Sequence, residues 1–420
     1  MTSPTPAFPR QQLEEALQRA RAAPLYEGRF PKTESLDRKR WEQLPLTKKD
    51  DLRAAYPFGL LAVSPDQLST YHESSGTSGR PISSYFTEGD WEDILTRFLR
   101  NGVRLCRQDM VLIKTPYALV TTAHQMHGAA RTVGATIVPA DNRSANMPYS
   151  RVLRLLHDLP VTVAWCMPTE ALLWAHAARK AGQNPAKDFP RLRTFLVAGE
   201  PLGAAKRARI EALWGGKRVL IDYGSTETGS LAGECERGHL HLWSDRLYFE
   251  VRDSQTGGFH QEGSGTLVVT PLFRKAMPLI RYDMEDTVEL SHAPCACGSA
   301  LPTVRVLGRE MGLVNVGARA VSALELEEAI YADAAKTGLW FWRARVREGS
   351  LEVEIHADED SARMRVLQAL EAAVPGVRVK VTAVAAERFV PDALLSREVP
   401  MQKPRFLFGE TEDWKSLDYA

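Results

Sequence analysis

A segment rich in glycine and hydroxyl side chains, residues 71–81, carries the residue types that bind phosphate. It reads Tyr-His-Glu-Ser-Ser-Gly-Thr-Ser-Gly-Arg-Pro. Glycines let the backbone approach a polyanion, and N–H groups, hydroxyls and an arginine can surround its oxygens. The alternative is a surface loop, because a Walker A loop needs G-x-x-x-x-G-K-[ST] and here only two residues separate the glycines. The candidate phosphate ligands are Ser74, Ser75, Gly76, Thr77, Ser78, Gly79 and Arg80.

A second motif, Asp-Tyr-Gly-Ser-Thr-Glu-Thr-Gly, occupies residues 222–229. Its acid, Glu227, could hold Mg²⁺, which prefers one or two carboxylates together with phosphate oxygens. A lone glutamate on a loop is usually just solvated. Two phosphate-and-metal motifs in one chain are harder to explain as surface loops than either motif alone.

The first motif resembles the phosphate loop of the acyl-adenylate-forming superfamily, which includes acyl-CoA synthetases and peptide-synthetase adenylation domains. Residues 44–59, Leu-Pro-Leu-Thr-Lys-Lys-Asp-Asp-Leu-Arg-Ala-Ala-Tyr-Pro-Phe-Gly, resemble its phenylacetate–CoA ligase branch. The resemblance runs from about residue 29 to residue 309 and continues more weakly to the C-terminus. It implies formation of an acyl-AMP, with ATP, Mg²⁺ and coenzyme A as cofactors.

The resemblance assigns roles within the second motif. Thr226 would hydrogen-bond the α-phosphate and act in catalysis with Glu227, and Tyr223 would lie along the adenine ring. The neighbouring residues expected to contact the nucleotide are Asp222, Gly224 and Ser225.

Three further places match the family pattern. Gly199, Glu200 and Pro201 resemble the segment that gives main-chain contacts to adenine, although an acid near a helix start also suits the helix dipole. Asp286, which ends Ile-Arg-Tyr-Asp-Met-Glu-Asp, would accept hydrogen bonds from the ribose hydroxyls. Arg309 would be a second ribose or phosphate contact at the hinge between domains.

The carboxylic acid is expected beside Tyr223, between the Gly199 loop and a helix that begins near residue 121. Family members place aromatic and polar side chains there to receive an aryl acid. The alternative is that histidines three apart on a helix are ordinary surface or core residues. The candidates in this region are Tyr117, His124, Gln125 and His127.

Four residues offer a separate metal site. Cys235, His241, Cys295 and Cys297 are soft or borderline ligands that could close a tetrahedral zinc site, with His239 as an alternative to His241. The spacing is not that of a standard zinc finger, and free buried cysteines are common. The phenylacetate–CoA ligase branch often carries similar cysteines, so the resemblance favours structural zinc.

The C-terminal part departs from the family pattern. The acid expected at the hinge is replaced by Met311, in a segment that helps to form the pantetheine tunnel in the family. Lys403 is the candidate for the adenylation lysine, although the glycine that usually precedes it is missing. A solvated lysine is the competing interpretation.

Composition limits the remaining classes of function. The 420 residues are 44% hydrophobic and 25% charged, which is ordinary for a globular protein. A net charge of +1 argues against nucleic acid and anionic membranes as partners. No apolar run is long enough to span a bilayer, and five cysteines argue for a reducing cytoplasm.

Short apolar runs alternate with helical patterns between residues 110 and 222, which predicts an α/β fold with a parallel sheet flanked by helices. The pattern then becomes β-rich, and a small α+β unit follows. We therefore expect an N-terminal adenylate-forming domain, residues 1–308, and a small mobile C-terminal domain, residues 309–420. In such sheets ligands bind beyond the C-terminal strand ends.

These observations predict an AMP-forming aryl–CoA ligase. The alternatives are an adenylating enzyme that passes the acyl group to a carrier-protein thiol or an amine, and a non-catalytic, zinc-stabilised binding protein with a ligase fold. An aryl carboxylic acid is the expected small-molecule partner. A carrier protein and a second copy of the chain, as a homodimer, are further candidate partners.

Overall fold

The computed structural model describes residues 8–30, 36–74, 80–142, 144, 146–309, 312–390, 404–412 and 414. The chain forms two compact units, each assembled from separate segments. Unit 1 contains Met1–Leu105, Pro116–Val133 and Asp222–Leu307, and unit 2 contains Cys106–Thr115, Gly134–Ile221 and Gly308–Ala420. The chain last passes from unit 1 to unit 2 between Leu307 and Gly308, beside the predicted domain boundary, and the division into two domains stays a prediction.

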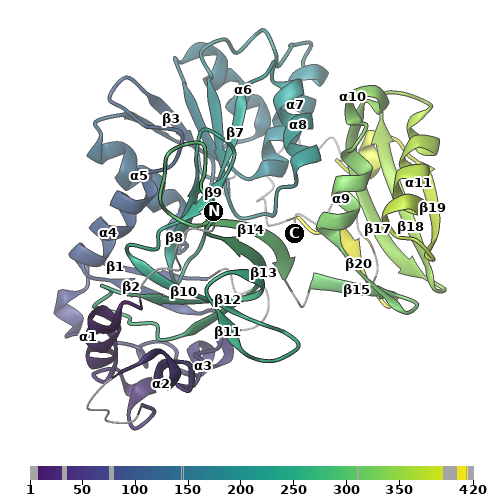
Figure 1. Ribbon diagram of the computed structural model, residues 1–420. Coiled ribbons are helices and arrows are strands. Elements are labelled where there is room, and N and C mark those ends of the chain that lie inside the picture. Colours follow the sequence, from purple (N-terminus) through teal and green to yellow (C-terminus); the bar gives the residue numbers. More distant parts are fainter. Residues whose placement is uncertain are drawn as a thin grey trace. The chain divides into compact units, whose positions relative to one another are not determined.

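Unit 2 contains the predicted parallel sheet, in the order β7-β6-β5-β3-β4. Strands β3 and β7 of this sheet are labelled in Figure 1. All four residues of both β5 and β6 are buried, as expected for strands covered on both faces. The strands are β3 (Met110–Ile113), β4 (Thr136–Pro139), β5 (Val163–Cys166), β6 (Thr194–Val197) and the first half of β7 (Arg218–Ser225). The helices are α6 (Tyr149–Asp158), α7 (Pro168–Lys180) and α8 (Ala204–Leu213).

The C-terminal part of unit 2 adds a mixed sheet in the order β19-β18-β17-β20. Its strands are β17 (Leu339–Arg347), β18 (Ser350–Ala357), β19 (Arg378–Ala383) and β20 (Leu407–Phe408). The helices beside it are α9 (Ala323–Tyr331), α10 (Ala334–Thr337), α11 (Ala362–Ala373) and the 3₁₀ turn Ala386–Arg388, and β15 (Leu313–Val316) pairs with β16 (Arg319–Ser322) in a hairpin.

Unit 1 is built on an antiparallel sheet in the order β11-β10-β12-β13-β14-β9-β8, and β8 pairs with the second half of β7. Its strands are β8 (Gly229–Glu234), β9 (Leu240–Leu242), β10 (Leu247–Arg252), β11 (Phe259–His260), β12 (Gly263–Pro271), β13 (Tyr282–Ser291) and β14 (Thr303–Arg309). A separate antiparallel pair, β1 (Thr70–Glu73) and β2 (Ser83–Phe86), flanks the predicted phosphate loop. The helices are α1 (Arg10–Ala20), α2 (Arg38–Glu42), α3 (Lys49–Ala54), α4 (Glu88–Phe98) and α5 (Thr121–Thr132), with 3₁₀ turns at Pro24–Tyr26 and Pro65–Gln67.

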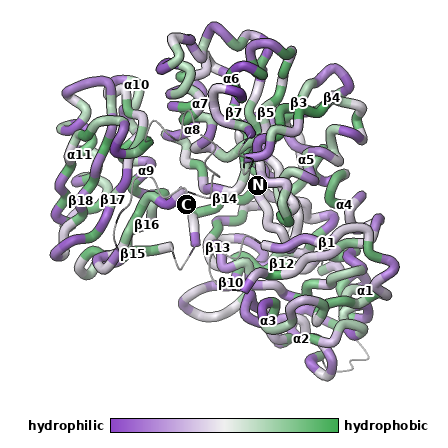
Figure 2. Tube along the Cα trace, turned by 180° about the vertical axis from the view of Figure 1, so that it is seen from behind, coloured by the Kyte–Doolittle hydropathy of each residue, from purple (hydrophilic) through white to green (hydrophobic). Residues whose placement is uncertain are grey.

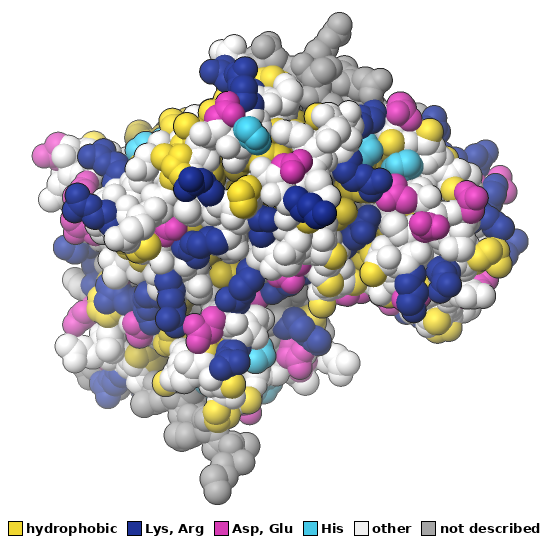
Figure 3. All heavy atoms as spheres, turned by 90° about the horizontal axis from the view of Figure 1, so that it is seen from above, with side chains coloured by type: hydrophobic (Ala, Val, Ile, Leu, Met, Phe, Trp, Pro, Cys, Tyr) yellow, Lys and Arg dark blue, Asp and Glu magenta, His cyan; other side chains and the backbone are white. Residues whose placement is uncertain are grey.

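The α/β fold class predicted from the sequence is therefore confirmed. Strands with one buried face, such as β18, alternate hydrophobic and hydrophilic residues along their length, and both colours appear on this strand in Figure 2. Basic and acidic side chains are interspersed over the face drawn in Figure 3, in keeping with the small net charge. Within the described chain, every helix is too short or too polar to cross a membrane.

A buried ion pair fixes the start of β13 in unit 1. Arg281 is 1% exposed, and its guanidinium contacts the Glu250 carboxylate at 3.0 Å. It also donates to the carbonyl oxygens of Glu42 and Leu44, each at 2.6 Å, while the Trp41 indole donates to Glu250 at 2.9 Å. This network anchors the strand that carries Asp286.

We predict that Glu250→Gln destabilises the protein by about 3 kcal/mol or more, because it leaves the buried Arg281 charge uncompensated. Chemical denaturation measures the change. Glu289→Gln, which breaks the exposed pair with Arg305, is the matched control and should cost no more than about 1 kcal/mol. Equal losses in the two variants would contradict this account.

Candidate functional site

The second sequence motif forms the hairpin between β7 and β8. Strand β7 ends at Ser225 and β8 begins at Gly229, so residues 226–228 make the turn. A Cβ atom on Gly224 would lie 2.1 Å from the Gly229 carbonyl oxygen, so only glycine fits there. The hydroxyls of Ser225 and Thr228 lie 3.1 Å apart and close the turn. The residues predicted to act in catalysis therefore sit in a tightly constrained turn.

Two buried arginines hold this hairpin by its backbone. Arg274 donates to the Glu227 carbonyl oxygen at 2.8 Å and to the Tyr85 carbonyl oxygen at 3.1 Å, and Arg97 donates to the Ser230 carbonyl oxygen. Glu227 is 5% exposed, and its carboxylate makes no hydrogen bond or ion pair within the described residues. Sequence reasoning missed both arginines, because no local motif marks them.

Asp222 and Gln125 form a buried polar group behind the hairpin. Asp222 accepts a hydrogen bond from the Ser230 hydroxyl at 2.6 Å and a longer one from the Gln125 amide at 3.4 Å. The Gln125 oxygen accepts from the Ser230 N–H at 3.1 Å. Burial raises the pKa of Asp222 to about 7, although these hydrogen bonds and the Arg97 charge favour its ionised form. The Gln125 amide thus supports the hairpin, and its predicted contact with the acid stays a prediction.

Tyr223 and Asp286, which the resemblance assigns to one nucleoside, are in direct contact. The Tyr223 hydroxyl donates to Asp286 at 2.7 Å, although the two residues are 63 positions apart. Both residues belong to unit 1. The contact brings the predicted adenine-stacking ring and the predicted ribose acceptor together.

The predicted phosphate loop is described only at its ends. Ser74 pairs with Ile82 across the base of the loop, because its N–H donates to the Ile82 carbonyl oxygen and its hydroxyl accepts from the Ile82 N–H, each at 2.9 Å. Arg80 is exposed. Ser75, Gly76, Thr77, Ser78 and Gly79 lie outside the described residues, as do Met311 and Lys403.

The predicted acid-binding side chains of α5 lie in an aromatic and histidine cluster of unit 1. His124 contacts the Tyr117 carbonyl oxygen at 2.7 Å, and the Tyr117 hydroxyl lies 3.3 Å from His127. His72, which sequence reasoning did not single out, packs 5.3 Å from the His124 ring and stacks on Trp91. Burial lowers the pKa of His72 to about 4, so its ring is neutral at neutral pH.

The remaining predicted nucleotide contacts belong to unit 2. Gly199 has a φ of +89°, a conformation that favours glycine, and Pro201 follows in the same loop. The Glu200 side chain accepts a hydrogen bond from Thr169 at 2.6 Å and lies 3.7 Å from Lys206, so its carboxylate faces inward. This placement agrees with a main-chain role for the segment. Arg309 ends β14.

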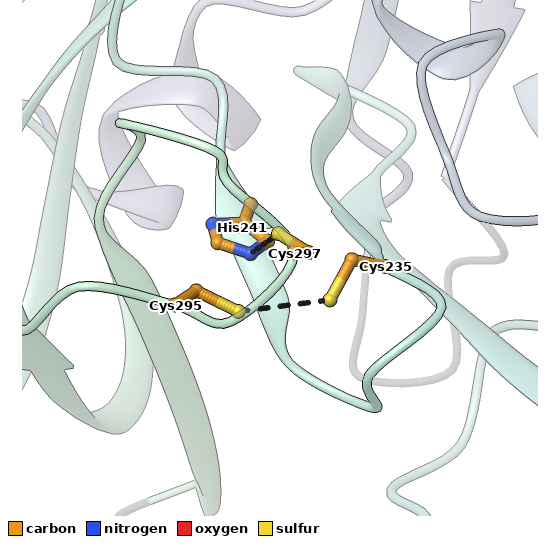
Figure 4. A group of neighbouring side chains, drawn as sticks. All are labelled: Cys235, His241, Cys295 and Cys297. Atoms are coloured by element: carbon orange, nitrogen blue, oxygen red, sulfur yellow. Dashed lines mark hydrogen bonds between the residues drawn. The ribbon is translucent and has the colours of Figure 1, made fainter.

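The four predicted zinc ligands come together in unit 1 (Figure 4). Their ligand atoms all lie within 4.8 Å of one another. The Cys235 and Cys295 sulfurs are 4.0 Å apart, and the Cys297 sulfur is 3.3 Å from His241 Nε2. The alternative ligand His239 also lies beside the cluster, with Nδ1 at 3.0 Å from the Cys295 sulfur.

The geometry of this cluster fits zinc. A tetrahedral ion with Zn–S bonds of about 2.3 Å separates its sulfur ligands by about 3.8 Å. His241 Nδ1 lies 2.9 Å from the Leu301 carbonyl oxygen, so it can donate there and leave Nε2 free for a metal. Backbone N–H groups of Arg237 and Ser299 donate to the sulfurs of Cys235 and Cys297, each at 3.4 Å, and so hold the two sulfurs in place.

Comparison with known proteins gives matches over most of the chain. The family described as AMP-binding enzyme matches residues 7–251. A phenylacetate-coenzyme A ligase of Thermus thermophilus is 35% identical over 265 residues, which cover 61% of this chain and 58% of that protein. One of Aromatoleum evansii is 31% identical over 297 residues, which cover 69% and 65%. The matched part of the chain thus spans less than two thirds of the length of either relative.

Solved structures give the same fold. The 2-hydroxyisobutyryl-CoA ligase in its postadenylation state, in complex with R3-HIB-AMP, matches with a TM-score of 0.82 at 22% identity, over 96% of this chain and 88% of that chain. A MatB structure from Rhodopseudomonas palustris matches with a TM-score of 0.54 at 19% identity, over 77% and 65%. The resemblance drawn from the motifs is confirmed.

The raised pKa of Asp222 predicts a pH-dependent contribution to stability. The folded protein holds a proton between about pH 4 and 7 that the unfolded chain releases, so this contribution is full below about pH 4 and is lost as the pH rises through 7. Asp222→Asn does not titrate. The free energy of unfolding of the wild type minus that of the variant should therefore fall by about 1.4 kcal/mol for each pH unit in this range.

Denaturant titrations at several pH values measure this difference. Asp66→Asn, at an exposed aspartate of the same unit, serves as the control. A difference that stays constant from pH 4 to 7 would show that Asp222 is ionised in the fold.

Proposed function

Because the chain belongs to the AMP-binding enzyme family, we propose that it activates a carboxylic acid with ATP and passes the acyl group to coenzyme A. The relatives named phenylacetate-coenzyme A ligase support an arylacetic or similar aromatic acid as substrate. The matched part of the chain covers only part of those relatives. The proposal therefore rests on the geometry of the site as well as on the relatives.

The proposed reaction has two steps. A carboxylate oxygen attacks the α-phosphorus of ATP, the new P–O bond forms and pyrophosphate leaves. The sulfur of coenzyme A, as its thiolate, then attacks the acyl carbon, and AMP leaves with the oxygen that came from the acid. Catalysis depends on positioning and on stabilisation of negative charge that develops on the phosphate oxygens.

The contact between Tyr223 and Asp286 is the observation that carries this proposal. It places an aromatic ring and a carboxylate, from two distant motifs, at hydrogen-bond distance. The ring can lie along adenine, while the carboxylate retains lone pairs for the ribose hydroxyls. A nucleoside is the ligand that this pair suits best.

The hairpin turn provides the phosphate end of the proposed site. Thr226 would donate to the α-phosphate. Glu227 would hold Mg²⁺, and its buried carboxylate without a partner among the described residues fits that role. When bound, the ion would neutralise the charge of the departing pyrophosphate.

Other residues complete the proposal. Asp222, Gly224 and Ser225 shape the hairpin, and Tyr117, His124 and Gln125 belong to the proposed acid site. Lys403, on the proposed mobile domain of residues 309–420, would neutralise charge in the adenylation step only. The proposed nucleotide contacts outside the hairpin are Ser74 to Arg80, Gly199 to Pro201, Asp286 and Arg309.

A carrier-protein thiol or an amine is the alternative acceptor, because Met311 stands where the family has its hinge acid. Mass spectrometry of the product separates the acceptors: an acyl-CoA supports coenzyme A. Persistent acyl-AMP in the presence of coenzyme A supports the alternative.

We also propose that Cys235, His241, Cys295 and Cys297 hold a structural zinc ion. All four coordination positions would be occupied by protein, so the metal would stabilise unit 1 without contacting the substrate.

We predict that Glu227→Gln lowers the turnover of acid-dependent AMP and pyrophosphate formation at least about tenfold. Loss of charge stabilisation at a departing pyrophosphate is worth roughly 2–4 kcal/mol. Steady-state release of pyrophosphate measures the effect. Glu262→Gln, at an exposed glutamate of the same unit, is the matched control. Wild-type turnover in the Glu227 variant would remove the metal assignment, and formation of ADP instead of AMP would remove the adenylate mechanism.

We predict about one zinc ion per chain, since one tetrahedral set is present among the described residues. Cys297→Ser should lose the metal and lower the melting temperature by several degrees, with a smaller effect on the adenylation rate. Elemental analysis and thermal unfolding measure both. Cys106→Ser, at an exposed cysteine outside the cluster, should change neither. Desalted wild-type protein without zinc would contradict the proposal.

A further inference from the structure

A buried group of polar side chains in unit 2 has no role in the reaction described so far. Lys114 directly follows β3, Asn142 lies three residues after β4, and Glu170 lies in the first turn of α7, directly after β5. Since these strands are parallel, their carboxyl ends lie at one edge of the sheet. That edge is where α/β proteins bind ligands.

Most polar atoms of this buried group have no hydrogen-bond partner among the described residues. Glu170 is fully buried, and within the part of the chain that the structure describes neither of its carboxylate oxygens is paired. The two polar side-chain atoms of Asn142 and the Thr115 hydroxyl are also buried and have no partner among the described residues. The Lys114 ammonium donates to the Asp141 carbonyl oxygen at 2.5 Å and forms no ion pair within the described chain. Buried polar groups are nearly always paired, so a ligand that satisfies them is expected.

The group offers both hydrogen-bond donors and hydrogen-bond acceptors. Burial raises the pKa of Glu170 to about 8, with Lys114 opposing the shift and Glu200 adding to it. The nearby Met167 N–H also favours the ionised form of Glu170, although it is not close or aligned enough to form a hydrogen bond with either carboxylate oxygen. The raised pKa favours the protonated form of Glu170, which can both donate and accept a hydrogen bond. With the Asn142 amide and the Lys114 ammonium, the group suits a hydroxyl or amino substituent.

The group adjoins the loop that carries Gly199. Thr169, the neighbour of Glu170, donates to Glu200 at 2.6 Å, and the second Glu200 oxygen is buried and unpaired. Gly199 precedes Glu200, and it is proposed to contact both the carboxylic acid substrate and the adenine of ATP. Lys114 lies three positions before Tyr117, another residue of the proposed acid site.

We propose that Lys114, Asn142 and Glu170 determine substrate specificity, by taking a hydroxyl or amino group that the acid carries away from its carboxylate. This inference rests on the proposed function. A site built to hydrogen-bond such a group discriminates strongly against the acid that lacks it, because its own polar atoms are then left unpaired.

The test compares acids that differ only in this substituent. ATP–pyrophosphate exchange is measured with phenylacetate, its three hydroxy isomers and 4-aminophenylacetate, and with benzoate and the corresponding hydroxybenzoates. We expect at least one substituted acid to have a kcat/KM at least tenfold above that of its unsubstituted parent. In Glu170→Leu this preference should fall at least tenfold, and Glu170→Gln, which keeps the shape of the side chain, should show a smaller loss in the same direction.

His176→Leu is the matched control. His176 lies on the same helix, is buried, and has an unpaired ring nitrogen, but it packs against Trp340 and Phe341 away from the group. In His176→Leu the ratio of kcat/KM for the substituted acid to kcat/KM for its unsubstituted parent should equal the wild-type ratio.

The outcomes separate this inference from the function on which it rests. Exchange with parent acids and no preference for any substituted acid overturns the specificity site and leaves the ligase proposal standing. A preference that survives intact in Glu170→Gln and in Asn142→Leu also overturns it. No exchange with any acid of the panel contradicts the proposed function and this inference together.

Discussion

The candidate site depends on the close approach of two backbones at the β7–β8 hairpin. A side chain at Gly224 would collide with the Gly229 carbonyl oxygen, and the pairing of the two strands shifts register between Tyr223 and Gly224. The first half of β7 pairs in parallel with β6, and the second half pairs antiparallel with β8. One strand therefore leads from the buried parallel sheet of unit 2 into the turn that presents Glu227 in unit 1. This constraint explains why glycines frame the motif.

Hydrogen bonds from four side chains support the backbone and the buried acid of this hairpin, while the Glu227 carboxylate in its turn has no partner among the described residues. Arg97 and Arg274 donate to its carbonyl oxygens, the Gln125 amide and the Ser230 hydroxyl satisfy Asp222, and Tyr223 is held by Asp286. The contrast with the unpaired Glu170 and Asn142 in unit 2 is informative. Where the structure supports a motif, polar atoms meet partners in the protein. Where several unpaired polar atoms gather at the ligand-binding edge of a parallel sheet, a ligand group can supply the missing partners.

Much of the fold could be predicted from local patterns, because alternating β-branched runs and helical segments are short-range signals. The alternation between residues 110 and 222 forms a parallel sheet with helices, as expected, and the four expected zinc ligands lie together. Strand β8 was missed because Gly-Ser-Leu-Ala-Gly-Glu has neither alternation nor β-branched residues. The support of the hairpin by Gln125 was missed because its partners are 97 and 105 positions away. Contacts of that separation leave no trace in a local pattern.

The central claim, activation of a carboxylate as its adenylate, is tested most directly by following its oxygen. With an acid labelled with ¹⁸O in the carboxylate, the account predicts that AMP gains one ¹⁸O atom, because the acid oxygen bonded to phosphorus leaves with AMP in the second step. Mass spectrometry of the nucleotide measures this transfer. Unlabelled AMP, or label in inorganic phosphate together with ADP, would contradict the account.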